Sequence, residues 1–278
     1  MTISQTPDSP NIYYKRAFAC QLIGRYTEAI IDYTMFIRYS SSDLQHKAYL
    51  NRGIVYGEIK EYQRALDDIH QACKSNPKSE YYIYCLARAE TSIGHKDEAH
   101  KKYNELVNIC QNESDGSMNQ YNRLFYCGFA LYELNKYDEA LTKFNEAFKC
   151  CEKNSQKADI KFYVGLVYYA LGNVGSAGDA LKEALKYDKN HTRALFRLGL
   201  IESQASDFQP EALNYLTEAY ESAPHNSYIL YERGDVYHKM GQLNACISDK
   251  QLALQLEHTV TDNLSIKSYE VKINNSKF

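Results

Sequence analysis

A small residue returns at nearly regular intervals along this chain of 278 residues. It occurs in segments such as GRYTEAIIDY, KEYQRALDDI and NKYDEALTKF, at gaps of 36, 34, 41, 37, 35 and 34 residues. We call these positions the register residues, and they are Ala29, Ala65, Ala99, Ala140, Ala177, Ala212 and Cys246. A period in this range is typical of a solenoid built from repeated helix pairs. The repeat therefore predicts an all-α solenoid and favours binding over catalysis.

Each repeat is predicted to contain two helices. In the fourth repeat, Gly128 lies twelve residues before the register residue Ala140, and Phe144 and Ala147 follow it by four and seven residues. Spacings of three, four and seven place side chains on one face of a helix, whereas a turn-forming residue such as Asn135 separates two helices. Each repeat is therefore predicted to be an antiparallel helical hairpin.

A second series of small residues precedes the register residues. It lies on the first helix of each predicted hairpin, and its members are Ala17, Gly53, Ala87, Gly128, Gly165, Gly199 and Gly234. A glycine inside a helix costs roughly 1 kcal/mol, and a larger side chain forced into a packed crossing costs about 1–3 kcal/mol. The recurrence of these residues predicts that the two helices of each hairpin cross in close contact.

These residues resemble the signature of the tetratricopeptide repeat, W-x2-L-G-x2-Y followed by A-x3-F. The second and fifth repeats match it at Gly53, Tyr56, Ala65, Ile69, Ala72 and Pro77, and at Gly165, Tyr168, Gly172, Ala177, Leu181 and Ala184. The resemblance covers about residues 10–258 and implies a right-handed superhelical solenoid of about seven such helix-turn-helix hairpins. The chain departs from the signature because it has no Trp, and because Glu90 and Lys250 stand where aromatic residues are usual.

The predicted organisation has three parts. Residues 1–9 are polar and are expected to form a flexible leader. The repeats are placed at residues 10–45, 46–79, 80–120, 121–157, 158–191, 192–226 and 227–258. The turn-rich segment 111–120 is expected to be an exposed loop between the third and fourth repeats. Residues 259–278 are expected to form either a capping helix or a tail that orders on a partner.

Composition and motifs argue against several functions. The formal net charge is −3, with lysines and arginines interspersed among acids, so we expect no nucleic-acid partner. No apolar run approaches the roughly 20 residues that span a bilayer, so we expect no membrane partner. The eight cysteines include no C-x2-C pair and are expected to be reduced and mostly buried. Because no catalytic or metal-binding motif is present, we expect neither a cofactor nor an enzyme.

The predicted binding site follows from the family resemblance. In tetratricopeptide-repeat proteins the first helix of each hairpin lines the concave surface, so an aromatic groove is expected there. Aromatic residues are good anchors because each buries a large area. The predicted partner-binding residues are Tyr14, Phe18, Tyr81, Tyr84, Phe125, Phe129, Tyr132, Phe162, Tyr169, Arg193, Phe196, Arg197, Tyr228 and Tyr231. The alternative is that the rings pack against neighbouring helices and that the two arginines form ion pairs within the array.

A chaperone-binding carboxylate clamp is disfavoured. In the family such a clamp needs Lys and Asn on one repeat, Asn on the next, and Lys and Arg on the third. Asn51 occupies one clamp position, but Tyr14 and Phe18 stand at the first pair of positions and Tyr81 and Cys85 at the third.

The sequence thus predicts a non-catalytic protein–protein interaction scaffold that holds a peptide, helix or extended segment in an aromatic concave groove. The expected partner is a protein in a multi-protein complex. The expected location is cytoplasmic, and family analogy alone suggests a cytoskeletal or ciliary assembly. One alternative is a freely diffusing adaptor or co-chaperone; another, from a different class, is an enzyme or the regulatory subunit of one. The oligomeric state is left open.

Overall fold

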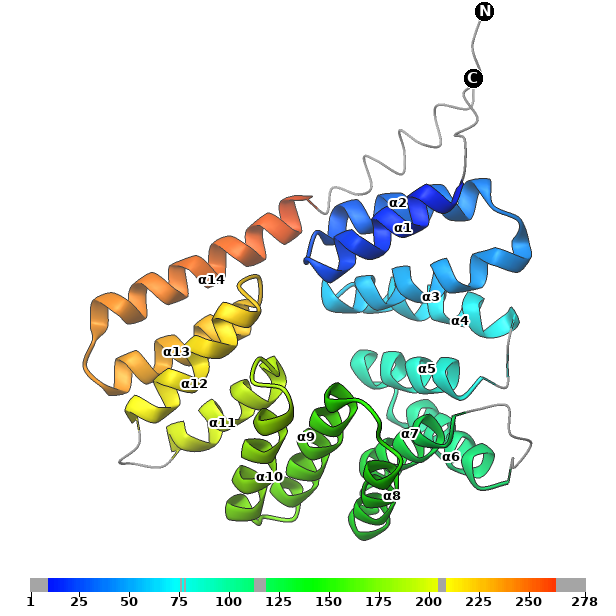
Figure 1. The fold of residues 1–278 in the computed structure, drawn as a ribbon. Helices are drawn as coiled ribbons and strands as arrows, with labels where there is room; N and C mark the ends of the chain where they lie inside the picture. Colours follow the sequence, from blue (N-terminus) through cyan, green and yellow to red (C-terminus); the bar gives the residue numbers. More distant parts are fainter. Residues whose placement is uncertain (1–9, 76, 78, 113–118, 205–208, 264–278) are drawn as a thin grey trace, which may run out of the picture. The chain divides into compact units, whose positions relative to one another are not determined.

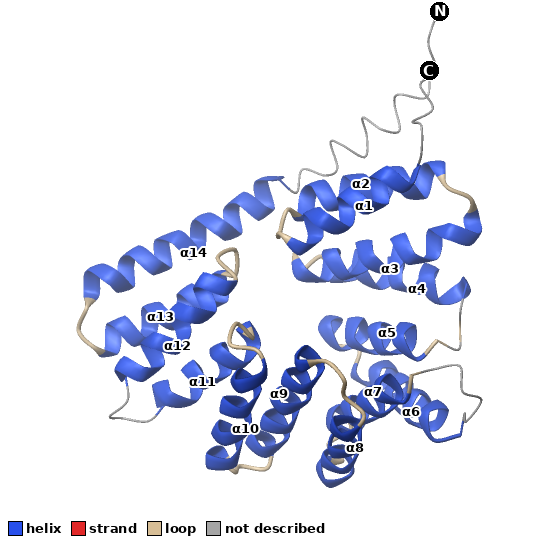
Figure 2. Cartoon of the chain, in the orientation of Figure 1, coloured by secondary structure: helices blue, strands red, loops and turns tan. Residues whose placement is uncertain are grey.

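The computed structural model of the chain describes residues 10–75, 77, 79–112, 119–204 and 209–263, with side chains up to residue 256. Within these residues all regular secondary structure is α-helical (Figure 1 and Figure 2). The predicted leader, most of the predicted 111–120 loop and residues 264–278 lie outside the described part of the chain.

The described helices form seven consecutive pairs. The pairs are α1 Pro10–Leu22 with α2 Tyr26–Tyr39, α3 Ser42–Glu58 with α4 Tyr62–Ser75, α5 Glu80–Ile93 with α6 Lys96–Asn112, α7 Gln120–Glu133 with α8 Tyr137–Lys149, α9 Asn154–Ala170 with α10 Val174–Tyr187, α11 Thr192–Gln204 with α12 Gln209–Ser222, and α13 Ser227–Lys239 with α14 Leu243–Asn263. The predicted all-α fold of seven helical hairpins is confirmed.

Two helices extend beyond the predicted limits. Helix α6 continues to Asn112, inside the segment predicted as a loop, because Leu106, Val107 and Cys110 keep one of its faces buried. Helix α14 continues to Asn263, five residues past the predicted end of the repeats at residue 258.

The helices group into two compact units, α1–α6 and α7–α14. In the first unit α2 packs on α3 and α4 packs on α5, so each hairpin stacks on the next. In the second unit the same stacking joins α8 to α9, α10 to α11 and α12 to α13. Successive first helices also touch, as α1 with α3, α3 with α5, α7 with α9 and α11 with α13. A single continuous array over residues 10–258 stays a prediction.

The register residues and the small residues opposite them are all buried. A Cβ atom added to Gly199 would lie only 2.6 Å from Cγ of Leu216 on the paired helix. A Cβ atom on Gly53 would lie 3.0 Å from the backbone oxygen of Ala65, which cannot turn aside as a side chain can. Because protein interiors are close-packed, these distances leave no room for a side chain. The predicted close crossings are confirmed.

Every hairpin turn that the structure describes contains a residue in the left-handed backbone region. In the fourth hairpin this residue is Asn135, with φ of 59°, at the turn predicted from the sequence. In the second hairpin it is Lys60, with φ of 63°. The sequence did not predict a left-handed residue at this position. Non-glycine residues adopt this conformation at a cost of roughly 1–2 kcal/mol, so the turn at Lys60 is held by the packing of α3 against α4.

Candidate protein-binding site

The predicted binding residues lie on the first helices of the hairpins, and we call this set of side chains the first-helix face. The exposed members are Phe18, Tyr81, Tyr169, Arg193, Arg197 and Tyr228. The half-buried members are Tyr14, Phe125, Tyr132, Phe196 and Tyr231. Three rings are buried, and these are Tyr84, Phe129 and Phe162. An exposed ring can contact a partner. The three buried rings instead pack against neighbouring helices, which was the alternative role that the sequence left open for them.

In the first unit, Tyr14 of α1 is tied to the next hairpin. Its hydroxyl accepts a hydrogen bond from Nδ2 of Asn51 on α3, at 2.9 Å. Its ring packs against Phe36 and Tyr33 of α2, with centroids 5.2 and 5.7 Å apart. Burial raises the pKa of Tyr14, and the hydrogen bond from Asn51 lowers it by a smaller amount. Asn51, the residue at a clamp-like position, is therefore engaged inside the chain.

Helix α5 carries a stack of aromatic and cationic side chains. The exposed ring of Tyr81 stacks on Tyr84, with centroids 6.4 Å apart and planes 19° from parallel. The guanidinium of Arg88 lies 5.6 Å from the centroid of Tyr84 and approaches its hydroxyl at 3.4 Å. Tyr84 thus fills the middle of the stack, and Tyr81 and Arg88 are its exposed ends.

In the second unit, Tyr163 of α9 is the centre of an aromatic cluster. The rings of Phe125 and Phe129 on α7 each meet it edge-on, with centroids 5.4 Å away. Phe144 of α8 stacks on it at 5.7 Å, and Phe162 lies beside it at 5.2 Å. Tyr163 was not among the predicted binding residues, although it follows Phe162 directly in the sequence. It joins the first helices α7 and α9.

Arg193 of α11 is also committed to a neighbouring hairpin. Its Nη2 atom donates to the carboxylate of Asp159 on α9, and its Nη1 atom donates to the hydroxyl of Tyr163 at 3.1 Å. Its guanidinium lies over the ring of Phe162, 4.7 Å from the centroid. The buried His191 completes the contact, because its Nε2 atom lies 3.3 Å from the same carboxylate. This is the inter-repeat ion pair that the sequence left as the alternative for Arg193.

Arg197 lies one turn further along α11 and has a different role. Within the described part of the chain no carboxylate pairs with it, and its side chain is exposed. Burial raises the pKa of Tyr132 on α7, and the positive charge of Arg197 acts in the opposite direction on the same group. Arg197 is therefore an exposed cation of this face, in contrast to Arg193, which is paired with Asp159.

The family comparison agrees with this architecture. The family described as tetratricopeptide repeat matches residues 128–186 and 164–209. Residues 128–209 of the chain thus carry tetratricopeptide repeats. A second family, described as anaphase-promoting complex subunit 5, matches residues 31–133. A TPR repeat-containing protein of Methanocaldococcus jannaschii is 35% identical over 122 residues, which is 43% of this chain and 20% of that relative. The chain thus spans about a fifth of the curated relative it matches.

Solved structures share the fold at low sequence identity. The crystal structure of a Rap protein complexed with competence and sporulation factor has a TM-score of 0.62 at 15% identity, covering 91% of this chain and 76% of that one. A thermophilic TPR protein of Thermus thermophilus has a TM-score of 0.55 at 20% identity, covering 69% of this chain and 99% of that one. At these identities the similarity shows the fold alone.

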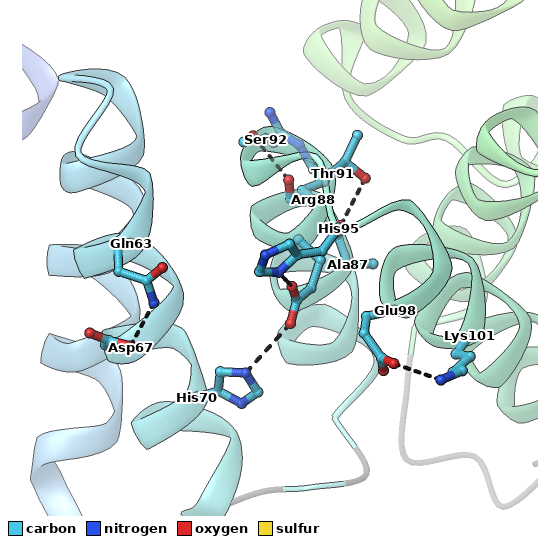
Figure 3. A network of polar contacts seen from close by, with 11 residues as sticks. Gln63, Asp67, His70, Ala87, Arg88, Thr91, Ser92, His95, Glu98 and Lys101 are labelled. Carbon is cyan, nitrogen blue, oxygen red and sulfur yellow. Dashed lines mark hydrogen bonds and ion pairs between the residues drawn. The ribbon is translucent and has the colours of Figure 1, made fainter.

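The TPR signature is broken at Glu90, and the structure shows what replaces the usual tyrosine. The buried carboxylate of Glu90 on α5 accepts from Nδ1 of His95 at 2.8 Å, and Nε2 of His70 on α4 lies 3.6 Å from its other oxygen (Figure 3). Figure 3 shows the two imidazoles coming from different segments. Glu90, which stands where the repeat signature has an aromatic residue, therefore forms a polar link between the second and third hairpins. The spacing of the histidines in the sequence did not predict this link.

The described residues offer neither a metal site nor a membrane-spanning helix. No group of three or more His, Cys, Asp or Glu side chains among them has an arrangement that could hold a metal ion. No helix in this part of the chain is long and apolar enough to cross a bilayer. All eight cysteines are free, and five of them are buried: Cys20, Cys85, Cys110, Cys127 and Cys246.

Proposed function

We propose that this protein is a non-catalytic scaffold that holds a peptide, a helix or an extended segment of a protein partner on its first-helix face. The observation that carries the proposal is the chemistry of the exposed members of that face. Tyr81, Tyr169 and Tyr228 expose aromatic surface, and Arg197 is an exposed guanidinium without a carboxylate partner in the described residues. Tyrosine and arginine are the residue types that dominate protein-binding energies.

The arrangement fits an apolar partner segment better than a carboxylate clamp. Arg193 is neutralised by Asp159, and Asn51 is used by Tyr14. One available cation leaves room for a single acidic group on the partner, whereas a clamp needs several donors. We therefore rank a freely diffusing co-chaperone below a scaffold for a stable partner.

The proposal also includes a cellular location and a type of assembly. We propose a cytoplasmic multi-protein assembly, of which a cytoskeletal or ciliary complex is the example that the family resemblance suggests. Its support is analogy, since the residues of the first-helix face indicate the chemistry of a partner without indicating its identity.

The test is recovery of endogenous partners by affinity purification and mass spectrometry. Replacing Tyr81, Tyr169 and Tyr228 together by alanine should remove the main companion while leaving the helical circular-dichroism signal unchanged, because all three side chains are exposed. The matched control is Tyr39→Ala, an exposed tyrosine on the second helix α2. A companion retained by the triple variant, or lost equally from the control, would show that the first-helix face is not the binding site.

A further inference from the structure

The last described helix exposes an apolar residue whose equivalents in α2 and α4 are buried. One position after the register residue, Ile30 of α2 and Leu66 of α4 are buried where those helices pack on the next hairpin. In α14 the same position is Ile247, which is 53% exposed. Leu243 and Leu254 lie on the same side of α14 and are also exposed. We call these three residues the α14 end face.

The first described helix exposes the complementary half of that interface. Five positions before the small residue of the first helix, Ile160 of α9 and Ile229 of α13 are buried against the preceding hairpin. In α1 the same position is Ile12, which is 60% exposed. Ile23 corresponds to the buried Ile59 of the second hairpin and is 64% exposed. We call Ile12, Leu22 and Ile23, all exposed, the α1 end face.

A polar contact shows the same pattern. Arg52 of α3 donates from Nη1 to Oγ1 of Thr34 on the preceding hairpin, at 2.8 Å. Arg16 of α1 occupies the equivalent position, but its side chain is 62% exposed, against 14% for Arg52. The position equivalent to Thr34 in α14 is Gln251, which is exposed. Arg16 and Gln251 therefore stand at the two repeat positions that Arg52 and Thr34 join inside the first unit.

We infer that two copies of this chain associate head to tail, with the α14 end face of one copy seated on the α1 end face of the other. The contact would repeat the interface by which α2 packs on α3 and α4 packs on α5. Large exposed apolar surfaces mark interaction sites, and α1 and α14 each carry one that the described residues leave uncovered. A contact between two different surfaces leaves one face free on each outer copy, so further copies can add until the assembly closes as a ring or grows as a filament.

The test uses the full chain in sedimentation velocity over roughly 1 to 100 µM, the range in which weak self-association becomes visible. The weight-average mass should rise from the 32.0 kDa of one chain to at least twice that value. Ile12→Asp blocks only the α1 end face and Ile247→Asp blocks only the α14 end face, so each variant alone should remain a single chain. Mixed in equal amounts, they should form a dimer, because each supplies the face that the other lacks.

Matched control variants change exposed polar neighbours of the two isoleucines. Asn11→Asp and Ser248→Asp should associate like the unaltered chain. Ile23→Asp and Leu254→Asp test the same faces if either first variant folds poorly. A chain that stays single at every concentration would overturn the inference. Dimers of either variant alone, or a mixture that stays single while the unaltered chain associates, would overturn it as well.

A separate test asks whether Gln251 of one copy faces Arg16 of the other. With Gln251→Lys, the new charge would face Arg16 of the second copy and should weaken association by about tenfold or more. Gln251→Glu should strengthen association and make it sensitive to salt. Equal behaviour of the two variants would overturn the register drawn from Arg52 and Thr34.

Discussion

Arg52 and Asp68 form a bidentate ion pair across the crossing of α3 and α4. Nε of Arg52 lies 2.7 Å from one carboxylate oxygen of Asp68, and Nη2 lies 2.8 Å from the other. Their side chains are nearly buried. Burial alone would lower the pKa of Arg52, but the hydrogen bonds and charge of Asp68 outweigh it and raise that pKa, so the guanidinium stays charged. The same pair recurs in the first and last hairpins, as Arg16 with Asp32 and Arg233 with Asp249.

Removing one partner of this pair should be costly. Asp68→Asn leaves the guanidinium of Arg52 buried without its counter-charge, and breaking a buried ion pair typically costs about 3–5 kcal/mol. We expect a loss in that range in the free energy of unfolding, measured by urea denaturation. The double variant Arg52→Met with Asp68→Leu should recover much of the loss, because it leaves no charge unpaired. A double variant as unstable as Asp68→Asn would contradict this account.

The close crossing at Gly199 predicts opposite effects for two glycine substitutions. Gly199→Ala places a Cβ atom 2.6 Å from Leu216 and should lower the free energy of unfolding by about 1–3 kcal/mol. Gly178, in α10, has no atom within 4 Å of the position that a Cβ would take, so Gly178→Ala should raise stability by up to about 1 kcal/mol through helix propensity. Thermal unfolding followed by circular dichroism measures both changes. Equal shifts in one direction would mean that the crossing is looser than the structure shows.

Buried thiols predict a loss of stability in alkali. Burial raises the pKa of Cys85 from its ordinary 9.0 to about 12, and burial likewise raises the pKa of Cys73 to about 11. Above about pH 9 the unfolded chain loses these protons while the folded chain keeps them, so the free energy of unfolding falls as pH rises toward the folded values. Below about pH 9 both states hold the protons and this contribution is constant.

Urea denaturation at about pH 7.5, 9 and 10.5 measures this slope. Cys85→Ala removes one of the titrating groups and should flatten it, even though the smaller side chain lowers stability at every pH. A slope that is unchanged in this variant would show that Cys85 does not contribute.

The chemistry of the first-helix face predicts how binding responds to salt. Contacts made mainly by aromatic rings should change the dissociation constant less than about threefold between low and high salt, because screening acts on charges. The partner recovered by affinity purification, titrated by fluorescence anisotropy, provides the measurement. Arg197→Ala should remove most of the residual salt dependence, whereas Arg25→Ala, which removes an exposed arginine paired with Glu28, should not. A steep salt dependence that survives Arg197→Ala would favour the clamp-type adaptor.

Much of the fold follows from the sequence because helix crossings demand small residues. Gly128 and Ala140 are buried, and a Cβ atom on Gly128 would lie 2.9 Å from the ring of Phe144 on the paired helix, so this crossing is as close as the small residues predicted. Asn135 takes the left-handed conformation at the predicted turn. These features depend on interactions within one hairpin, and a periodic pattern records such interactions directly.

The candidate site could be predicted only in part. The sequence placed Phe129 and Tyr81 in one aromatic set, yet Phe129 is sealed against Tyr163 while Tyr81 is exposed. Both residues lie on first helices but at different positions of the repeat, and Phe129 is buried where Tyr163 of the next hairpin packs on its ring. Glu90 shows the same limit, since its histidine partners come from different segments.

The sequence by itself therefore determined the helices, their pairing and the small residues at the crossings, because each depends on residues that are close together along the chain. Only the tertiary structure decided that Arg193 is paired with Asp159, while the exposed Arg197 has no carboxylate partner among the described residues. The two arginines have the same chemistry and lie on the same helix. Folding brings a carboxylate of α9 to the first, and none from the described part of the chain to the second.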